Sequence, residues 1–527
     1  MRLTTDVLVI GGGATGAGVL RDLAMRGFDA ILVERGDLAT GTTGRFHGLL
    51  HSGARYVVKD PKAAEECIHE NRVLRRIAAD SIEDTGGLFV TTPLDDPAYA
   101  DKFVAACEQC DVPCEEISVG DALRREPRLN PKITRAFVVP DASVDAWKTV
   151  WATARSAKEY GGRVLPYNEV VALEKGGPGG ADVVGAVVRD RRSGEETEIG
   201  AGLVVNAAGA WAGRVAALAG SALKVMPGKG IMIAMNHRLV NTVINRCTMP
   251  ADGDILVPIR TVSVIGTTDV HVEDPDHWEI TREEVQEMLD AGENLIPGFR
   301  RARALRAWGG VRPLYQATAV ADDRDITRAH TVIDHSATDG IGRLVTIVGG
   351  KFATYRLMAE ETVDHVCRQL EVERPCRTAD EQLPDSEPEG YYWIGSRLRE
   401  REQTLHDDQL ICECELVPRR RIEEEVRRRH TVNLDDIRRM VRVGMGPCQG
   451  GFCIYRGTGI MHAVQRLNGP QANRSLLDFL QERWKGVQPI LYGDQLRQAR
   501  YDDWIFQGLL DIEHAREGAG AGAGAET

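Results

Sequence analysis

Four of the eleven cysteines in this 527-residue chain have the spacing of ligands to a metal centre. Cys412 and Cys414 form a C-x-C pair, and after 33 intervening residues Cys448 and Cys453 form a C-x4-C pair. The second pair lies in GMGPCQGGFC, whose glycines leave backbone N–H groups free to hydrogen-bond sulfur. Four thiolates suit a tetrahedral zinc ion or an iron–sulfur cluster, and metal-free thiols are the third interpretation.

A glycine-rich turn near the start of the chain has the pattern of a dinucleotide site. The motif GGGATG, residues 11–16, lies between an expected strand at 6–10 and an expected helix that ends at Gly27. Such a turn lets the backbone approach a pyrophosphate, and the helix start offers free N–H groups. Glu34, at the end of the next expected strand, 30–34, is placed to accept hydrogen bonds from a ribose diol. Its negative charge disfavours a 2′-phosphate.

Two further turns favour FAD over NAD. The apolar segment VVNAAGAW, residues 204–211, ends in small residues that let the backbone pass close to a dinucleotide. At Gly349-Gly350-Lys351 an expected strand breaks and an expected helix, 352–367, begins, with its positive dipole end available to an anion such as a reduced flavin. Three segments on one cofactor suit a buried FAD, although each of the last two alone also fits an ordinary glycine turn.

Three cations stand in contexts that suit an anionic substrate. Arg55 in HSGARY and Arg312 in GGVRPL carry guanidinium groups, whose fork matches phosphate oxygens. Lys351 lies inside the glycine turn of a chain in which lysine is scarce, and it is placed to stabilise a reduced flavin or to bind substrate. The alternative for each of the three is a solvated surface charge.

The elements that position these groups follow from the hydrophobic pattern. Strand, glycine turn, helix and strand within about 30 residues form a βαβ unit, which predicts a doubly wound α/β sheet. Short strands between 225 and 350, with one helix at 282–289, predict a second sheet inserted into the first domain, which resumes at Leu344. Further expected helices are 61–79, 99–110 and 142–160, and further expected strands are 163–167, 183–190 and 202–209.

Composition restricts the class of protein. The chain is 43% hydrophobic and 27% charged with a net charge of −13, which indicates a folded globular protein without the basic excess that nucleic acid or anionic lipid attracts. It has no apolar stretch of 18 residues and no signal peptide, and its cysteines do not form a dense disulfide framework. These features predict a protein of a reducing compartment.

The motifs together resemble a known family. The order of GGGATGAG, ATGTTGRFHGLLHSGARY, NAAGAWAG, GTTD, GGVRPL and GGKFATYR is similar to FAD-dependent glycerol-3-phosphate dehydrogenases. The last third, with ICECE, RVGMGPCQGGFC and ERWKGVQPILYGDQLRQARYDDWIFQGL, resembles the large catalytic subunit of the anaerobic, multi-subunit type. The resemblance extends from Asp6 to about Leu510.

The resemblance implies a site and a reaction. The expected reaction is oxidation of glycerol 3-phosphate at C2 by FAD, with electrons leaving through a 2Fe-2S cluster at Cys412, Cys414, Cys448 and Cys453. The expected catalytic residues are His51, Arg55, Tyr56, Arg312 and Lys351. The expected cofactor contacts are Gly11, Gly13, Ala14, Thr15, Gly16, Glu34, Arg35, Thr42, Thr43, Gly44, His47, Gly48, Leu50, Ala208, Gly209, Gly350, Lys351 and Phe352.

The general base departs from the family pattern. In the related aerobic enzymes a histidine follows a Lys-Gly pair near the flavin, whereas here Lys229-Gly230 is followed by Ile231. We predict His51 as the base because the ordinary histidine pKa of about 6.5 suits proton exchange near neutral pH. His47, in the same loop, is the second candidate, and either ring could serve only to hydrogen-bond the flavin or the backbone.

These inferences give a fold class and a set of partners. We predict an α/β fold. A Rossmann-like FAD-binding domain carries an inserted mixed-sheet substrate domain, and these two are followed by a small bacterioferritin-associated-ferredoxin-like 2Fe-2S domain and a C-terminal helical segment.

The resemblance implies partner subunits, including a membrane-anchoring iron–sulfur subunit, that deliver electrons to quinone on the cytoplasmic side of the membrane. The predicted ranges are 1–376 (FAD-binding parts about 1–60, 150–224 and 341–376; substrate parts about 61–149 and 225–340), 377–408 (linker), 409–460 (2Fe-2S), 461–515 (helical) and 516–527 (disordered tail).

Three rival functions remain at this stage. A FAD-dependent dehydrogenase or oxidase of another 2-hydroxy or amino acid would keep the flavin motifs but need cations arranged for a carboxylate. A binding module would use FAD and zinc only for structure. Nucleic-acid binding has least support, because the acids in RRRIEEEVRRRH interrupt its basic runs. The C-terminal segment, with Trp484 and Trp504, fits either a docking surface or a cap on the chain's own core.

Overall fold

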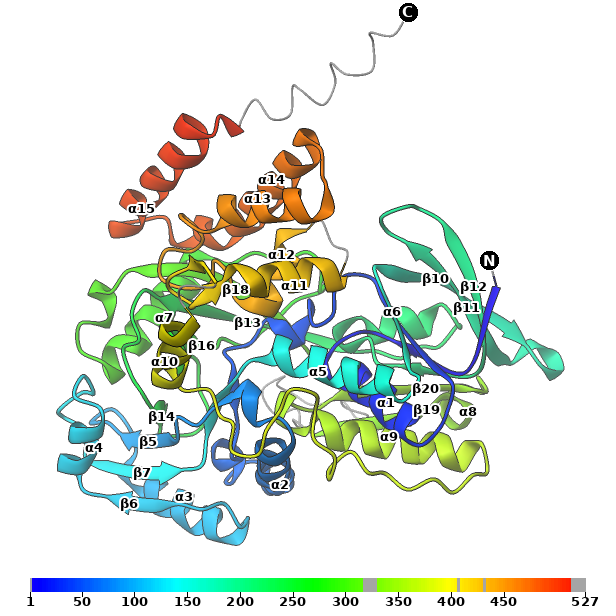
Figure 1. The fold of residues 1–527 in the computed structure, drawn as a ribbon. Helices are drawn as coiled ribbons and strands as arrows, with labels where there is room; N and C mark the ends of the chain where they lie inside the picture. Colours follow the sequence, from blue (N-terminus) through cyan, green and yellow to red (C-terminus); the bar gives the residue numbers. More distant parts are fainter. Residues whose placement is uncertain (1, 316–328, 405–407, 430–432, 513–527) are drawn as a thin grey trace, which may run out of the picture.

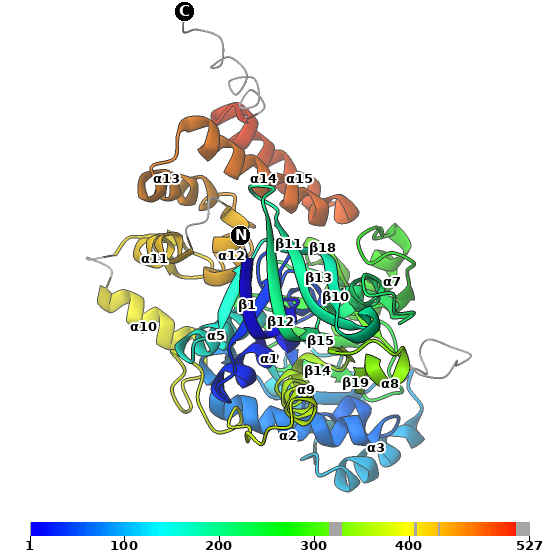
Figure 2. The same cartoon turned by 90° about the vertical axis from the view of Figure 1, so that its right-hand side faces the viewer.

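The computed structural model describes residues 2–315, 329–404, 408–429 and 433–512 (Figure 1). It contains two large sheets and a helical C-terminal unit. Figure 2 shows α13, α14 and α15 at one end of the molecule and α2 and α3 at the other. The predicted disordered tail, 516–527, lies outside the described residues. Bounds in the C-terminal unit are β21 Leu410–Cys412, β22 Val417–Pro418, α11 Arg419–Arg429, α12 Leu434–Val441, α13 Ile454–Gln465, α14 Gly469–Val487 and α15 Asp494–Asp503.

The first sheet is the predicted doubly wound one. Its parallel strands lie in the order β9, β2, β1, β12 and β20, and antiparallel β10, β11 and β19 extend it. Because β19 already joins this sheet, the chain returns to it before the predicted Leu344. The strands are β1 Arg2–Ile10, β2 Ala30–Glu34, β9 Arg163–Pro166, β10 Asn168–Gly176, β11 Asp182–Asp190, β12 Glu196–Asn206, β19 His330–Asp334 and β20 Leu344–Gly349.

Alternation along β1 divides the apolar residues between two cores. Val7 and Val9 pack with helices α1 (Ala14–Met25), α5 (Ala146–Glu159) and α9 (Tyr355–Gln369), whereas Leu8 and Ile10 pack against residues of β10 and β11. Successive strand side chains point to opposite faces, so a fully apolar strand is one buried on both sides. The carboxyl end of β1 therefore delivers the glycine turn from a rigid centre.

The predicted helix 142–160 is wrong at its start. Residues Ala142–Val144 form the short strand β8, which pairs with β3 (Leu49–Leu50) and β4 (Ile82–Glu83). Asp145 then accepts a hydrogen bond from the backbone N–H of Lys148 and acts as the N-cap of α5. The helix therefore starts only after this capping residue, which separates it from the strand.

The second sheet contains strands from two separate parts of the sequence. Strand β13 pairs with β18 along one edge and with β17 and β16 along the other edge. From β16 the sheet continues in the order β15-β14-β5-β7-β6. Helix α7 continues past its predicted end at 289, because Gly292 and Leu295 extend its buried face. The bounds are β5 Gly87–Thr91, β6 Glu115–Ile117, β7 Arg135–Val139, β13 Met226–Met235, β14 Val243–Arg246, β15 Ile255–Ile259, β16 Val262–Gly266, β17 Val270–His271, β18 Ala304–Leu314 and α7 Arg282–Leu295.

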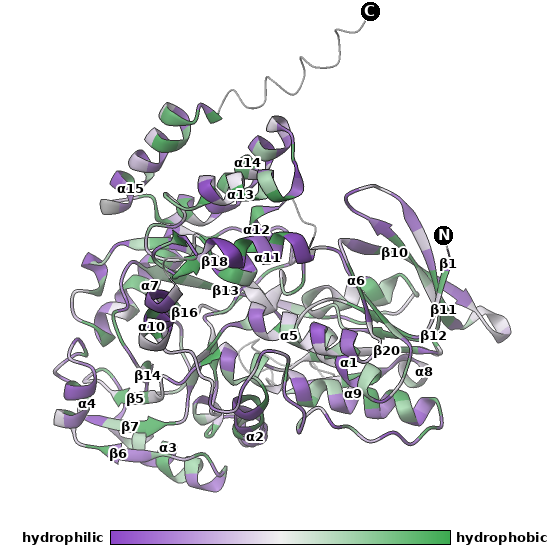
Figure 3. Cartoon of the chain, viewed as in Figure 1, coloured by the Kyte–Doolittle hydropathy of each residue, from purple (hydrophilic) through white to green (hydrophobic). Residues whose placement is uncertain are grey.

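Smaller helices complete the architecture. The predicted helices 61–79 and 99–110 correspond to α2 and α3, and the predicted linker region contains α10. Helix α11 is hydrophilic over most of its surface (Figure 3), and its buried Ile422 and Val426 attach it to the C-terminal core. The bounds are α2 Pro61–Ile77, α3 Pro97–Gln109, α4 Val119–Arg125, α6 Ala212–Ala217, α8 His335–Thr338 and α10 Ile394–Thr404.

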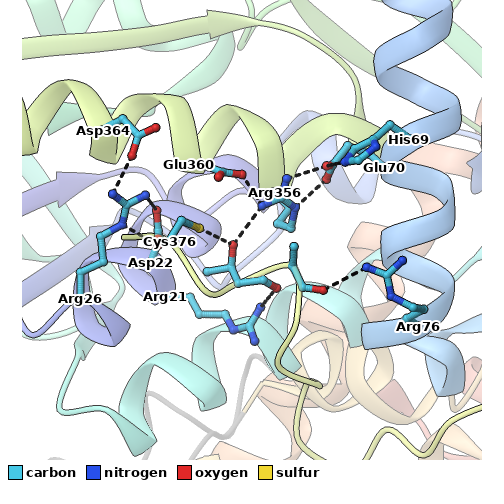
Figure 4. A network of polar contacts seen from close by, with 12 residues as sticks. Arg21, Asp22, Arg26, His69, Glu70, Arg76, Arg356, Glu360, Asp364 and Cys376 are labelled. Carbon is cyan, nitrogen blue, oxygen red and sulfur yellow. Dashed lines mark hydrogen bonds and ion pairs between the residues drawn. The ribbon is translucent and has the colours of Figure 1, made fainter. Parts of the chain in front are cut away.

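A buried polar network fixes the start of α9, which follows the glycine turn at 349–351 (Figure 4). The Arg356 guanidinium donates two hydrogen bonds, of 2.8 and 2.6 Å, to the fully buried Glu70 carboxylate on α2. Arg21 on α1 donates to the carbonyl oxygen of Thr378 at 3.1 Å. Removing one partner of such a buried pair costs about 3 to 5 kcal/mol, so the network fixes α9 relative to α1 and α2.

Candidate active site and cysteine centre

A cavity of about 2180 Å³ lies among the two sheets and the C-terminal unit. Its lining includes the first glycine turn, residues 39–49 and His51, the facing residues of β13, β16 and β18, and residues 349–352. All five predicted catalytic residues line it. Of the predicted cofactor contacts, Gly16 and Leu50 do not. The structure therefore brings the three predicted dinucleotide segments and the predicted cations around one space.

The glycines of the first turn are required by close approach of backbone. A Cβ on Gly11, which has φ +110°, would lie 2.6 Å from the Ala207 carbonyl oxygen. A Cβ on Gly16 would lie 1.9 Å from the Gly11 oxygen, so Gly16 lets α1 start directly against the turn. Gly16 therefore shapes the turn without reaching the cavity. Leu50 is fully buried in the core on the helix side of the first sheet and does not line the cavity, so its contact with a cofactor stays a prediction.

The end of β2 forms a polar corner of the cavity. Glu34 accepts hydrogen bonds from the backbone N–H groups of Gly12 at 2.7 Å and Gly36 at 2.8 Å, and burial raises the pKa of its carboxyl group. Arg35 stacks on the Trp211 ring at 4.4 Å and pairs with Asp276 at 2.8 Å. The sequence analysis did not predict that the Trp211 ring forms part of this corner, although Trp211 ends the segment VVNAAGAW. The corner offers an acceptor and a flat aromatic wall to a nucleoside.

The loop 42–48 and the turn at 349–352 contact each other in the lining of the cavity. The Thr43 hydroxyl accepts a hydrogen bond from the Ala14 N–H at 3.0 Å, which joins the loop to the start of α1. Phe46 stacks on Phe352 with ring centroids 5.3 Å apart. Gly350 has φ +74°, a backbone conformation that favours glycine, and a Cβ there would also lie 2.3 Å from the Met358 sulfur. Thr42, Gly44, Gly48, Ala208 and Gly209 complete this part of the lining.

The two predicted substrate arginines pair with aspartates, of which Asp254 is fully buried and Asp269 is partly buried. Arg55 pairs with Asp254 at 2.7 Å, and Arg312 pairs with Asp269 at 3.0 Å and donates to the Thr268 carbonyl oxygen at 2.9 Å. These contacts fix the two guanidinium groups in the cavity wall. Neither aspartate was predicted from the sequence, because both lie far from their arginines in the chain.

A third cation and an aromatic ring stand beside these arginines. The Lys351 ammonium lies 4.7 Å from the centre of the Tyr56 ring, and the His51 ring lies 5.4 Å from that same ring. Lys229, by contrast, is buried against Glu284 at 2.8 Å and does not line the cavity. The cationic part of the site is therefore formed by Arg55, Arg312 and Lys351.

Two neutral imidazoles lie between the cations. The rings of His47 and His51 are 6.1 Å apart. Burial, reinforced by Arg55 and Arg312, lowers the pKa of His47 to about 3, and burial with His47 and Arg55 lowers the pKa of His51 well below its usual range. His47 Nδ1 accepts the Leu49 N–H at 3.2 Å, so the proton of the neutral ring is on Nε2. His47 is thus a donor toward the cavity, and His51 is the better placed acceptor of a proton.

Burial of neutral His47 makes stability depend on pH. An unfolded histidine binds a proton below about pH 6.5, whereas folded His47 does not until about pH 3. The unfolded chain therefore binds more protons in this window, and the free energy of unfolding decreases as the pH falls, by up to about 1.4 kcal/mol per pH unit from this residue. We expect His47→Gln to flatten the decrease between about pH 6.5 and 5, measured by chemical denaturation.

The control for this prediction is His237→Gln, because His237 is exposed outside the cavity. This variant should keep the wild-type pH dependence. A slope in His47→Gln identical to that of the wild type would mean that folded His47 is protonated near neutral pH, contrary to its surroundings.

The four predicted cysteine ligands come together at the edge of the C-terminal unit. The sulfurs of Cys414 and Cys448 are 3.7 Å apart, and Cys453 contacts both Cys448 and Cys412. Hydrogen bonds from Cys414 and Cys453, and from the backbone N–H groups of the following loop, hold the pKa of Cys448 well below its usual range. Among the described residues, no group of three or more His, Cys, Asp or Glu side chains is arranged to hold a single metal ion.

The glycines around these cysteines act as the sequence predicts. A Cβ on Gly446 would lie 2.3 Å from the Cys414 Cβ, so this glycine lets the two cysteine loops meet. The N–H groups of Gly450 and Phe452 bond Cys448, and the N–H of Gly444 bonds Cys412. Closely placed sulfurs with backbone donors fit an iron–sulfur cluster.

The cysteine loops border the active-site cavity. Met445 and Gln449, on either side of Cys448, line it. Glu415 accepts hydrogen bonds from Thr261 at 3.0 Å, in the turn between β15 and β16, and from Arg442 at 2.9 Å. Ile259 and Val262, beside that turn, also line the cavity. The cysteine centre and the dinucleotide cavity therefore share one wall.

Comparison with known proteins agrees with this architecture. A family model described as FAD dependent oxidoreductase matches residues 6–356, and one described as a BFD-like 2Fe-2S binding domain matches residues 410–463. Fold and site therefore define a FAD-dependent oxidoreductase that carries a 2Fe-2S binding domain. The fold likeness is also seen in the glycerol-3-phosphate dehydrogenase from Bacillus halodurans, complexed with FAD, with a TM-score of 0.64 at 20% identity over 93% of this chain and 96% of that one.

Relatives that match nearly the whole chain define its family more closely than the family models do. The A subunit of the anaerobic glycerol-3-phosphate dehydrogenase of Escherichia coli (strain K12) is 43% identical over 98% of this chain and 98% of its own length. The A1 subunit of the same kind of enzyme from Haloferax volcanii is 43% identical over 94% of this chain and 89% of its own. The chain belongs to the family of anaerobic glycerol-3-phosphate dehydrogenase A subunits.

Proposed function

We propose that the chain oxidises sn-glycerol 3-phosphate to dihydroxyacetone phosphate. The observation that carries the proposal is that Arg55, Arg312 and the histidine pair line the same cavity as the dinucleotide turn. Glu34 and Lys351 are among the residues that would hold FAD in this cavity, and FAD would supply the acceptor for the C2 hydride. The names of the relatives, which cover nearly the whole chain, support this substrate.

In this proposal the chain binds and orients the alcohol. Arg55 and Arg312 bind the phosphate, and their aspartate partners keep them in place before substrate arrives. We assign His51 as the acceptor of the C2 hydroxyl proton. Burial and the nearby cations keep its ring neutral, but they also lower its pKa, so His51 is a weaker base than the ordinary histidine that the sequence analysis assumed. His47 donates from Nε2 to the substrate oxygen or the cofactor. Lys351, beside Tyr56, places positive charge where negative charge develops during the reaction.

Replacing Arg312 tests the phosphate assignment. We expect Arg312→Ala to lose about 2 to 3 kcal/mol of charge-assisted hydrogen bonding, which is roughly a 30- to 150-fold rise in KM for glycerol 3-phosphate. Steady-state kinetics with a dye acceptor measure it. The control is Arg189→Ala, because Arg189 is an exposed residue of β11 that pairs with Glu196 across the strand. A KM within twofold of the wild-type value would remove Arg312 from the substrate site.

The proposal extends to the route of the electrons. The four cysteines would hold a 2Fe-2S cluster, which would supply a one-electron carrier between the flavin site and partner subunits, including a membrane-anchoring iron–sulfur subunit, with quinone as the final acceptor. The shared wall between cavity and cysteine loops supports the first step, and the relatives, which are named as subunits, support the partners. Among the described residues, no helix has both the length and the apolarity to span a bilayer. In this proposal, the partner subunits place the chain at the cytoplasmic face of the membrane.

A further inference from the structure

A chain of side-chain hydrogen bonds crosses the first sheet next to the cofactor turn 207–209. Asn206, the last residue of β12, stands in register with Thr346 of the neighbouring strand β20. The Asn206 amide donates to the Thr346 hydroxyl at 3.2 Å, and this hydroxyl lies 2.7 Å from Nε2 of His335 in α8. All three side chains are fully buried. The chain therefore connects α8 to the strand end that leads into the cavity.

The far end of this chain is the carboxylate of Asp339. Nδ1 of His335 lies 2.8 Å from it, and the Ser221 hydroxyl donates to the same carboxylate oxygen. The hydrogen bond from Ser221, together with that from His335, holds the pKa of the Asp339 carboxyl below its ordinary value. Asp339 is therefore an anion at neutral pH, and a carboxylate anion can only accept hydrogen bonds.

This anion sets the direction of every hydrogen bond in the chain. Because Asp339 accepts, Nδ1 of His335 carries the proton, and Nε2 of the neutral ring is an acceptor. The Thr346 hydroxyl then donates to Nε2, and its oxygen accepts from the Asn206 amide. The nitrogen of that amide is therefore kept toward Thr346.

The orientation of the Asn206 amide fixes the backbone that follows it. Its nitrogen also donates to the Ala212 carbonyl oxygen at 2.8 Å, and its oxygen accepts the Ala208 N–H at 3.3 Å. A flipped amide would place donor against donor at Ala208 and acceptor against acceptor at Ala212. Residues 207–209 line the cavity, and this turn packs closely against Gly11 of the first glycine turn.

We propose that His335 and Thr346 are positioning residues for FAD, which act through Asn206 to hold residues 207–209 in the conformation that binds the cofactor. The proposal rests on the FAD site of the proposed function, and it concerns side chains that do not themselves line the cavity. Loss of the Thr346 hydroxyl removes a partner from both His335 and Asn206, which leaves buried polar groups unsatisfied and the amide free to flip.

The test measures release of FAD from the full chain loaded with FAD and cluster, followed by the rise in flavin fluorescence. We expect Thr346→Val, which keeps the shape but lacks the hydroxyl, to release FAD about tenfold faster than the wild type. Thr346→Ser keeps the hydroxyl and should restore release to within about twofold of the wild-type rate.

The matched control is Thr362→Val. Thr362 is also fully buried, but its hydroxyl donates to the Met358 carbonyl oxygen of its own helix at 2.7 Å. This variant should lose thermal stability and keep the wild-type rate of FAD release. If Thr346→Val behaves in the same way, the chain of hydrogen bonds serves stability alone and the proposal is overturned.

A double-mutant cycle shows whether the effect passes along the chain. His335→Leu should also accelerate FAD release, and adding it to Thr346→Val should cause no further acceleration, because the chain is already broken. Fully additive effects would contradict the proposal. If His335→Leu does not fold, the comparison of Thr346→Val with Thr346→Ser still decides. FAD release is measured without substrate, so an error in the proposed substrate would not change the result.

Discussion

Replacement of Cys414 by serine is expected to abolish electron delivery to a soluble quinone while glycerol 3-phosphate still reduces the flavin. Cys414 touches Cys448 and lies beside Glu415, at the wall that the cysteine centre shares with the cavity. Loss of one thiolate removes a cluster ligand but leaves the dinucleotide turn and the substrate arginines unchanged. Anaerobic stopped-flow absorbance measures flavin reduction, and steady-state turnover with quinone measures the exit of electrons.

The matched control is Cys110→Ser, because Cys110 is a buried cysteine of the substrate region outside the four-cysteine set. It should retain both flavin reduction and quinone reduction, together with the iron content of the wild type. If Cys414→Ser slows flavin reduction as much as quinone reduction, the centre has a structural role. If metal analysis of the wild-type protein finds zinc and no iron, the cysteine centre likewise has a structural role.

Replacement of His51 by asparagine is expected to slow anaerobic flavin reduction by about 10²- to 10⁴-fold, the usual cost of losing a general base. Asparagine keeps the polarity of the side chain but cannot accept the proton. Saturating glycerol 3-phosphate should still bind, because Arg55 and Arg312 are retained. Single-turnover absorbance measures the rate constant.

His47→Asn is the matched comparison, and it should slow flavin reduction less. His47 already accepts a backbone hydrogen bond at Nδ1, so it cannot take up a proton there without losing that contact. A larger loss in His47→Asn than in His51→Asn would assign the base to His47 instead. Equal rates in His51→Asn and wild type would remove His51 from proton transfer.

Features encoded by neighbouring residues were predictable from the sequence. The glycine turn, Glu34 and the cysteine spacing each depend on a few consecutive positions, and a strand end fixes their geometry. Pairing across distant elements was not predictable. Asp254 and Asp269 are single acids in a chain rich in them, and only the packing of elements that are distant in the sequence brings them to Arg55 and Arg312.

Of the two interpretations that the sequence left open for the C-terminal segment, the structure shows the cap on the chain's own core, and a docking surface stays a prediction. Phe479 and Phe506 are buried in one core with Ile411 and Ile437, so the segment caps the cysteine unit. Trp504, in the same stretch of sequence, is 68% exposed. Aromatic residues at helical spacing do not reveal from the sequence which of them faces the core, because that depends on how the helices pack.

The central claim is that the cavity holds FAD against a phosphorylated alcohol bound by arginines. An anaerobic titration of the purified protein, followed through the flavin absorbance bands, tests it directly with glycerol 3-phosphate in one sample and L-2-hydroxyglutarate in another. The account predicts that glycerol 3-phosphate bleaches the flavin and that the 2-hydroxy acid does not. Bleaching by L-2-hydroxyglutarate alone, or a protein that takes up no FAD, would contradict it.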